Sequence, residues 1–320
     1  MIDPTTQLFP PLEPYATHQL SVGDGHMLYV EESGNPHGLP ALVLHGGPGS
    51  SCKPEHRQRF DPAVWRIICF DQRGCGRSIA PPQGPLHANT TQHLVADCDA
   101  IRQHLNIATW ATLYGSSWGS TLALAYAQAF PHHVRSLMIS GIFLADHDAL
   151  SWFYNPMGLP QFIPNEFSAV QAHAAGVQGH AMIEAIYAKG ADAIKALVFY
   201  ESMASELTPD ATAIQAYVNE AGKGQAGAIE VSYFAHRCYL AEGQLLQNAH
   251  KIAHLPIFIQ QGLQDMVCPP AGAHRLAEAL RAAGGKPTLE IIPACGHRAT
   301  PAMEAARVAH LAALATQLQA

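Results

Sequence analysis

Leu113-Tyr-Gly-Ser-Ser-Trp-Gly-Ser120 is the stretch of sequence that decides the fold. Within it, Gly115-x-Ser117-x-Gly119 matches the nucleophile elbow, a strained turn between a strand and a helix that exposes a serine hydroxyl. Glycines are required on both sides, because a Cβ atom there would collide with the neighbouring strand and helix. An apolar run precedes the motif, and an Ala- and Leu-rich helical stretch, Thr121–Phe130, follows it. An ordinary Gly/Ser turn is the alternative, and this context argues against it.

Similar apolar runs recur along the chain, with helix-length stretches between several of them. Strands that alternate with helices form parallel βαβ units, so the sequence predicts an α/β fold with helices on both faces of a mostly parallel sheet. A run that follows a Gly-Asp-Gly turn is expected to belong to an N-terminal hairpin. The expected strands are Met27–Glu31, Ala41–Leu44, Trp65–Phe70, Ala111–Tyr114, Val134–Ile139, Pro256–Gln260 and Leu289–Ile292. The expected helices are Asn89–Leu105, Thr121–Phe130 and Ala271–Ala283.

The strand–helix alternation lapses between about Gly141 and Ala249, where the sequence is Ala-rich, aromatic and mainly helical in pattern. A helical block that interrupts an α/β pattern is best explained as an insertion covering one edge of the sheet. We therefore expect a catalytic core formed by residues 1–140 and 249–320, and a helical cap formed by residues 141–248.

Composition excludes several classes of protein. The chain has 320 residues, of which 48 % are apolar and 13 % charged, so a disordered chain is excluded. A net charge of −7 without a run of Lys or Arg argues against a nucleic-acid partner. No apolar stretch reaches the ~18–20 residues of a membrane helix, and the N-terminal sequence has no secretory signal pattern. The seven cysteines include no CxxC pair, which predicts free thiols in a reducing compartment, most simply the cytoplasm.

Two further residues supply the partners that a nucleophilic serine needs. Asp265 follows the expected strand Pro256–Gln260, and His297 follows Leu289–Ile292 in a Gly-His turn. Open α/β sheets place their ligands at the carboxyl ends of strands, and the elbow architecture has the chain order Ser, acid, His. We predict that Ser117 is the nucleophile, His297 its base and Asp265 the acid that orients the base. A surface aspartate and an ordinary loop histidine are the alternative. Because the imidazole must be neutral, activity is expected to rise with pH near ~6–7.

A glycine loop, His45-Gly-Gly-Pro-Gly-Ser50, directly follows the expected strand Ala41–Leu44. An amide of Gly46 or Gly47, together with the amide of Trp118, is predicted to hold the oxyanion that develops during acyl transfer. A phosphate-binding loop is the alternative, but the Lys-Ser/Thr ending of a Walker motif and a G-x-G-x-x-G pattern are both missing. The sequence also lacks the H-E-x-x-H motif of a zinc site, so neither a metal nor a cofactor is expected.

A second loop, Asp71-Gln-Arg-Gly-Cys-Gly-Arg-Ser78, is rich in Gly and Arg and follows the expected strand Trp65–Phe70. It could clamp a phosphate, but a network of acids and arginines beneath the site explains it better. Cys75 has no matching histidine, and the Ser117 set explains more of the sequence than a cysteine nucleophile does.

Several segments occur in the order and spacing of a known family. They are HGGPGS (45–50), DQRGCGRS (71–78), NTT…LVAD (89–97), GSSWGSTLALAYAQAFP (115–131), GIF (141–143), WFY (152–154), DMVCPP (265–270) and GH (296–297). On these segments the chain resembles the proline iminopeptidases (prolyl aminopeptidases) of the α/β-hydrolase superfamily over most of its length. The resemblance implies the α/β-hydrolase fold with an inserted cap, and it implies the same triad.

In that family, two glutamates of the cap hold the free N-terminal nitrogen of the substrate. The family patterns W-x-x-W-E and I-E-N-H-Y-F align with residues 197–201 and 229–234, so the resemblance implies this role for Glu201 and Glu230. The physical chemistry agrees, because a protonated amine in a water-poor pocket needs a compensating carboxylate. Two solvated glutamates on helix surfaces are the alternative.

The resemblance also concerns the pocket for the proline side chain. Phe143 and Phe153 match aromatic positions that line this pocket in the family. Leu197 and Tyr200 replace both tryptophans of W-x-x-W-E, and Ser140 stands where relatives usually carry Arg. These departures leave the triad intact, but they are expected to reshape the pocket on the acyl side of the substrate.

Together these features predict a cytoplasmic serine aminopeptidase. It would release the N-terminal residue, with proline as the preferred residue, from short peptides with a free N-terminus. The reaction would pass through an acyl-enzyme. A carboxylesterase or amidase of the same fold, whose cap has lost amine recognition, is the alternative. A non-catalytic binding protein of this fold is a further alternative, against which the complete triad argues. Neither nucleic acid nor a membrane is expected as a partner, and association into a homo-oligomer stays open.

Overall fold

One mixed sheet organises the chain. The structure, a computed structural model, describes residues 2–3, 5–220 and 223–319. The sheet has the strand order β1-β2-β4-β3-β5-β6-β7-β8. The pairs β1–β2 and β2–β4 are antiparallel, and the remaining neighbours are parallel. The strands are β1 (Ala16–Ser21), β2 (Met27–Gly34), β3 (Leu39–Leu44), β4 (Trp65–Phe70), β5 (Thr112–Ser116), β6 (Leu137–Ser140), β7 (Ile257–Gly262) and β8 (Thr288–Ile292).

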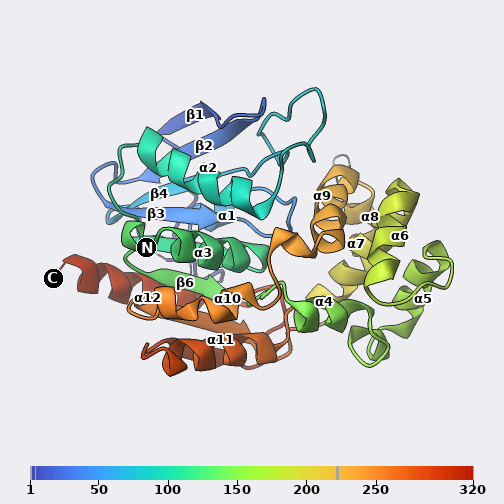
Figure 1. The fold of residues 1–320 in the computed structure, drawn as a ribbon. Coiled ribbons are helices and arrows are strands. Elements are labelled where there is room, and N and C mark those ends of the chain that lie inside the picture. Colours follow the sequence, from blue (N-terminus) through green and yellow to red (C-terminus); the bar gives the residue numbers. More distant parts are fainter. Residues whose placement is uncertain (1, 4, 221–222, 320) are drawn as a thin grey trace.

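Helices cover both faces of this sheet, as Figure 1 shows. Because successive side chains of a strand point to opposite faces, β3 contributes to two separate hydrophobic clusters. Leu42 and Leu44 pack in the cluster that includes side chains of α2, α3 and α11, whereas Ala41 and Val43 pack in the cluster with Leu311 and others of α12. The helices are α1 (Pro54–Arg57), α2 (Thr91–His104), α3 (Trp118–Ala129), α4 (His147–Tyr154), α5 (Pro164–His173), α6 (His180–Lys189), α7 (Ala191–Ser205), α8 (Ala211–Val218), α9 (Lys223–Ala235), α10 (Gln244–Gln247), α11 (Pro270–Ala282) and α12 (Pro301–Gln319).

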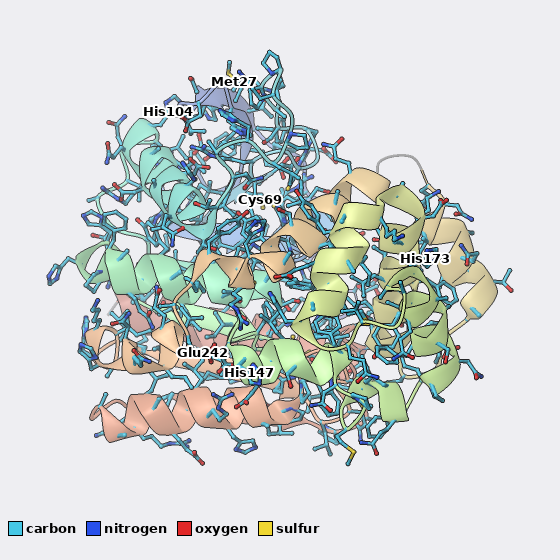
Figure 2. All side chains as sticks on the ribbon, turned by 45° about the vertical axis from the view of Figure 1, so that its right-hand side comes forward. Met27, Cys69, His104, His147, His173 and Glu242 are labelled. Carbon is cyan, nitrogen blue, oxygen red and sulfur yellow. The ribbon has the colours of Figure 1, made fainter. Side chains whose placement is uncertain are left out.

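Helices α4–α9 lie between β6 and β7 in the chain and gather beyond one end of the sheet (Figure 1). Among them, α7 contacts α5, α6, α8 and α9. At the start of α4, the backbone amide of His147 donates to the carboxylate of Glu242 at 3.0 Å, which ties the first of these helices to the segment that leads back to the core (Figure 2). Of the helical stretch expected after Gly141, α4–α9 therefore lie beyond the end of the sheet at which β3 ends, whereas α10 contacts α3 and α11.

The α/β-hydrolase fold expected from the sequence is confirmed. Strand β4 coincides with the expected run, whereas β6 begins only at Leu137. The three residues Pro131–His133 form a 3₁₀ turn, and Val134 makes only an isolated bridge to Trp110. The sequence analysis did not identify α12, whose apolar residues complete the second cluster.

The loop 71–78 forms a network of ion pairs beside the sheet. Arg73 donates to both carboxylate oxygens of Asp97 at 2.8 and 2.9 Å, and both side chains are about 2 % exposed. The same guanidinium lies 3.2 Å from Asp24, whose side chain is 45 % exposed. Arg77 similarly joins Asp71 and Glu31. The loop therefore fixes its backbone through buried charge pairs.

This network gives a test of stability. Asp97→Ala leaves the buried Arg73 guanidinium without its main counter-charge and should lower the free energy of unfolding by about 3–5 kcal/mol. Asp24→Ala removes a solvent-screened partner of the same guanidinium and should change stability little. Urea denaturation followed by circular dichroism measures both variants. Equal losses for the two would show that burial of the Arg73–Asp97 pair does not control stability here.

Candidate active site

Ser117 occupies a strained turn between β5 and α3. Its backbone has φ 57° and ψ −128°, a combination that residues with a side chain rarely adopt. A Cβ on Gly115 would lie 2.2 Å from the carbonyl oxygen of Gly119, and a Cβ on Gly119 would lie 2.2 Å from that of Leu44 in β3. Both glycines are therefore required by packing, for the reason inferred from the sequence. The amide of Ser117 donates to the carbonyl of Ser140 at 3.0 Å, which anchors the turn to β6.

Asp265 and His297 lie together in the loops that follow β7 and β8. Nδ1 of His297 lies 2.9 Å from Oδ2 of Asp265 and 3.1 Å from Oδ1. The Asp265 carboxylate also accepts from the amides of Val267 and Cys268 at 3.0 and 2.8 Å and from Nε2 of Gln261 at 2.9 Å. With its side chain only 1 % exposed, Asp265 is a buried acceptor held by several donors, and it fixes the orientation of the imidazole.

The imidazole of His297 lies beside the nucleophile turn. A Cβ built on Gly141 would lie 3.3 Å from Cε1 of His297 and 3.5 Å from the amide nitrogen of Ser117. Gly141 has φ 53°, so both the backbone conformation and the space favour glycine at this point. The structure thus brings all three residues of the predicted triad to one place at the carboxyl ends of β5, β7 and β8.

The pKa of His297 is displaced by its surroundings. Burial lowers this pKa, but the negative charge of Asp265 and the neighbouring Cys268 thiol outweigh burial and hold it well above its usual value. A neutral imidazole is therefore reached at higher pH than the ~6–7 expected from the sequence. Cys268 is buried, and its proximity to His297 could not be read from any sequence spacing.

Gln72 braces the glycine loop and the start of α3. Its backbone amide donates to Nε2 of His45 at 3.0 Å, and its side chain donates to the carbonyl of His45 at 2.9 Å. Its Oε1 accepts from Nε1 of Trp118 at 2.9 Å. A Cβ on Gly46 would lie 3.6 Å from Cβ of Ser117, so the loop passes directly beside the serine side chain. The oxyanion role of the Gly46, Gly47 and Trp118 amides stays a prediction.

A cleft of about 750 Å³ opens between this loop and the α7, α8 and α9 helices. Its lining includes the loop 47–51, Glu201 of α7 and Glu230 of α9. Glu230 is 7 % exposed and Glu201 is partly buried, and each of the two carboxyl groups shifts the pKa of the other. The structure therefore brings the two predicted glutamates together, although 29 residues separate them in sequence.

Two adjacent carboxyl groups in a buried site cannot both ionise freely. Burial raises the pKa of Glu230 well above its usual value, and the charge and hydrogen bond of Glu201 raise it further. Burial also raises the pKa of Glu201, which the hydrogen bond from Glu230 and the charge of His297 partly offset. The two carboxyl groups therefore titrate as one coupled pair, in which ionisation of one opposes ionisation of the other.

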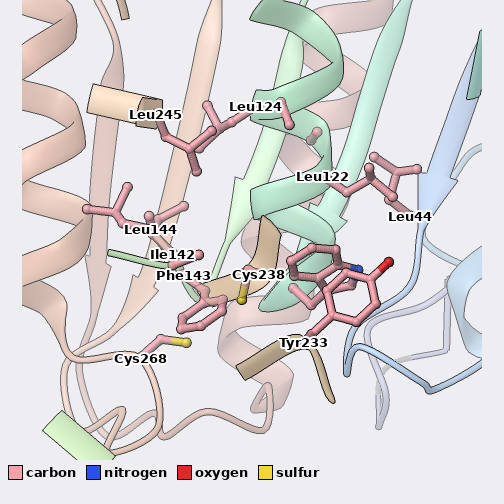
Figure 3. Packing of buried hydrophobic residues seen from close by; sticks show 14 of the residues in the cluster. Leu44, Leu122, Leu124, Ile142, Phe143, Leu144, Tyr233, Cys238, Leu245 and Cys268 are labelled. Carbon is pink, nitrogen blue, oxygen red and sulfur yellow. The ribbon is translucent and has the colours of Figure 1, made fainter. Parts of the chain in front are cut away.

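Phe143 and Phe153 are buried together with an aromatic ring that the sequence analysis did not identify. Phe234 lies 5.7 Å from Phe143 and 6.3 Å from Phe153 between ring centroids. Figure 3 shows Phe143 in the hydrophobic cluster at this end of the sheet. Phe234 follows Glu230 by four residues on α9, so helical spacing from Glu230 could have indicated it. Among the described residues, neither Phe143 nor Phe153 lines the 750 Å³ cleft, and their role in substrate binding stays a prediction.

Among the residues that the structure describes, no group of three or more His, Cys, Asp or Glu side chains is placed to hold a metal. Within the same residues, no helix is long and apolar enough to cross a membrane. Cys75 is buried, which raises the pKa of its thiol and opposes the thiolate that a cysteine nucleophile needs.

Comparison with known proteins places the chain among enzymes. Residues 40–299 match a family described as alpha/beta hydrolase fold. The chain is 39 % identical over 300 residues to a protein of Leptolyngbya boryana named "Probable proline iminopeptidase", covering 91 % of each chain. It is 38 % identical to a proline iminopeptidase of Xylella fastidiosa, covering 91 % of this chain and 94 % of that one. The crystal structure of a proline iminopeptidase-related protein from Thermus thermophilus aligns with a TM-score of 0.63 at 21 % identity, over 94 % of this chain and 98 % of that one, and supports the fold.

The pKa of His297 gives a test of the site. For an uncharged ester substrate, kcat/KM should rise with pH along a limb centred above the ~6.5 of an unperturbed histidine, because only the neutral imidazole accepts a proton. Asp265→Asn removes the charge that raises this pKa, so the limb should move to lower pH while kcat falls. Profiles of kcat/KM against pH measure both midpoints. Coincident midpoints would show that Asp265 does not control the protonation of His297.

Proposed function

Since the chain belongs to the proline iminopeptidase family of alpha/beta hydrolases, we propose that it is a serine aminopeptidase that releases the N-terminal residue of peptides, with proline as the preferred residue. The observation that carries this proposal is the pair of adjacent carboxyl groups, Glu201 and Glu230, which line the same cleft as the glycine loop and lie close enough to His297 for its charge to lower the pKa of both. An ester substrate has no cation that such a pair would recognise.

The proposed reaction uses a covalent intermediate. Ser117 attacks the carbonyl carbon of the first residue while His297 accepts the hydroxyl proton, and Asp265 stabilises the imidazolium. Amides of Trp118 and of the glycine loop hold the oxyanion. The tetrahedral species then expels the amine of the remaining peptide, which takes the proton from His297. Water, deprotonated by His297, attacks the acyl-enzyme and regenerates Ser117.

The glutamate pair defines where the peptide begins. The N-terminal nitrogen of proline carries two N–H donors when it is protonated. One N–H bonds the Glu201 carboxylate, which supplies the compensating charge, and the other bonds a carboxyl oxygen of Glu230. Because two buried carboxyl groups disfavour each other's ionisation, an ammonium group that contacts both compensates the negative charge that the pair develops. This requirement limits cleavage to the bond after the first residue.

The positions that depart from the family pattern lie behind the substrate site. Leu197 and Tyr200 are 2 % and 0 % exposed. The Tyr200 hydroxyl donates to the carbonyl of Phe153 at 3.0 Å, so it holds the backbone beside the aromatic group proposed to receive the proline ring. Ser140 accepts from Nη2 of Arg307 at 2.8 Å, on the side of the sheet that α12 covers. Of these contacts, only that of Tyr200 acts on Phe153, so it is the departure that we expect to reshape the pocket for the proline ring.

We assign substrate recognition to residues 141–248, acting as a cap over a core formed by residues 1–140 and 249–320. Short peptides with a free N-terminus are the proposed partners. All seven cysteines are buried free thiols, which agrees with a reducing compartment such as the cytoplasm.

The glutamate pair provides the test of this function. Glu201→Gln keeps the size of the side chain but removes the charge that meets the ammonium, which should cost about 3–5 kcal/mol, or roughly 10²–10³-fold in kcat/KM for a prolyl arylamide. Glu230→Gln removes the other carboxyl group of the pair and should also lower kcat/KM for the arylamide selectively. A short-chain nitrophenyl ester, which carries no cation, should be hydrolysed by both variants within about threefold of wild type.

Ser117→Ala is the matched control, because it should abolish turnover of both substrates while circular dichroism shows an intact fold. Equal losses on the arylamide and the ester in the Glu201 variant would mean that this residue supports the fold only. Unchanged hydrolysis of the arylamide would favour the esterase interpretation.

A further inference from the structure

Helix α9, which carries Glu230, contacts α7 so closely at Gly227 that a side chain there is excluded. A Cβ on Gly227 would lie 2.6 Å from Cγ2 of Ile194 and 2.8 Å from Cγ2 of Val198, both on α7. Gly227 precedes Glu230 by three residues, and Val198 precedes Glu201 by three. Residues three apart share one face of a helix, so this close approach lies one turn from the point where the two carboxyl groups meet.

On the other side of Glu230, Tyr233 joins α9 to the core. Tyr233 is 0 % exposed, and its hydroxyl donates to Oδ1 of Asn89 at 2.9 Å. Asn89 in turn donates to the carbonyl oxygens of Arg73 at 3.0 Å and Pro85 at 2.8 Å, so its side chain is held in one orientation. The Tyr233 ring packs edge-on against Trp118 with centroids 5.0 Å apart, and Figure 3 shows Tyr233 in the same cluster as Phe143.

The chain after α9 is also fastened to the start of α2. The 3₁₀ turn Arg237–Tyr239 has three successive residues with φ between 50° and 53°, a left-handed conformation that residues with side chains avoid. The Thr91 hydroxyl donates to the carbonyl of Cys238 at 2.5 Å, and Nε2 of Gln92 donates to that of Tyr239 at 2.5 Å. The segment NTTQ at 89–92, which the proposed reaction does not use, therefore serves as the docking point for the end of α9.

At its first turns α9 also meets the loops next to the nucleophile. A Cβ on Gly49 would lie 2.3 Å from the carbonyl oxygen of Ala226, and Nε2 of Gln225 donates to the carbonyl of Gly74 at 3.0 Å. The helix is thus held against the core on both sides of Glu230 and against α7 at Gly227. Such contacts leave Glu230 little freedom to move relative to Glu201.

We propose that Gly227 and Tyr233 are positioning residues for amine recognition, which hold α9 so that the carboxyl group of Glu230 faces that of Glu201 across the cleft. The proposal rests on the function proposed above. A hydrogen bond weakens steeply when its atoms move by about 0.5 Å or more, so a small shift of α9 separates the pair and reduces its hold on an ammonium group. The serine chemistry, which sits on β5, β7 and β8, does not depend on this distance.

Tyr233→Phe tests the contact with Asn89, because it removes one hydroxyl and keeps the ring on Trp118. We expect kcat/KM for a prolyl arylamide to fall about 5- to 20-fold, mainly through KM, because Asn89 loses its buried donor and α9 its tether. Hydrolysis of the nitrophenyl ester should stay within about twofold of wild type.

Tyr126→Phe is the matched control. Tyr126 is also 0 % exposed, and its hydroxyl donates to Asp99 at 3.1 Å, but it lies on α3 and its bond does not involve α9. Its removal should lower the thermal midpoint to a similar extent while the ratio of arylamide to ester activity stays unchanged. If the ratio of arylamide to ester activity falls equally in Tyr233→Phe and Tyr126→Phe, the loss is due to lower general stability and the proposal is overturned.

Gly227→Ala tests the contact with α7. The added methyl should push α9 away from α7, so the ratio of arylamide to ester activity should fall at least as far as in Tyr233→Phe. Adding Ile194→Ala removes the nearest obstructing atom and should restore part of the ratio. Absence of rescue in a folded double variant would contradict a positioning role for Gly227.

The Glu201→Gln and Glu230→Gln variants are measured together with Tyr233→Phe and Gly227→Ala. They separate the proposed aminopeptidase function from the positioning role of Gly227 and Tyr233. If neither glutamate variant loses arylamide activity selectively, the proposed function fails. If they do but Tyr233→Phe and Gly227→Ala leave the ratio of the two activities unchanged, the function stands and the positioning role is overturned.

Discussion

The backbone of Ser117, held at φ 57° and ψ −128°, is the constraint on which the rest of the site depends. This conformation is costly for a residue with a side chain, and it persists only where the surroundings impose it. Here Gly115 and Gly119 allow the helix, the strand and the neighbouring β3 to approach within distances that no Cβ could occupy. The same close approach sets the loop after β3 beside the serine, so the strained turn and the placing of the glycine loop have a common origin.

A second constraint is the burial of two acidic side chains, Glu201 and Glu230, next to each other. Catalysis by a serine triad does not require Glu201 or Glu230, and two carboxyl groups in a partly closed cleft destabilise each other. One turn away from them, α7 and α9 approach closely at Gly227, where a glycine leaves room for the contact. A site of this kind becomes favourable when a cation enters it. In the proposed function, specificity for a free amino group would thus come from helix packing in residues 141–248, added to a core that could hydrolyse other acyl compounds.

Much of the core could be predicted from the sequence, because its signals are local. The elbow at Ser117 is a five-residue pattern, and Asp265 and His297 each follow a recognisable apolar strand, so strand alternation alone places them at one edge of the sheet. The parts that could not be predicted depend on pairings between distant segments. Phe234 joins the aromatic group only because α9 docks where it does, and the high pKa of His297 follows from the tertiary placing of Asp265 and Cys268.

The cap illustrates the same limit in another way. Its helices carry weak periodicity, and the resemblance to a family, more than any physical pattern, identified Glu201 and Glu230 as a pair. What the sequence could not indicate is how the pair is held, because Gly227 and Tyr233 acquire their meaning from Ile194 and Asn89, which lie far from them in the chain.

The most direct measurement is a crystal structure of Ser117→Ala with a bound prolyl dipeptide. The account predicts that the proline nitrogen lies within about 3.2 Å of carboxyl oxygens of both Glu201 and Glu230. It also predicts that the carbonyl carbon lies over residue 117, with the carbonyl oxygen directed at the amide of Trp118. A peptide whose amino group faces solvent, or whose first carbonyl lies away from residue 117, would contradict it.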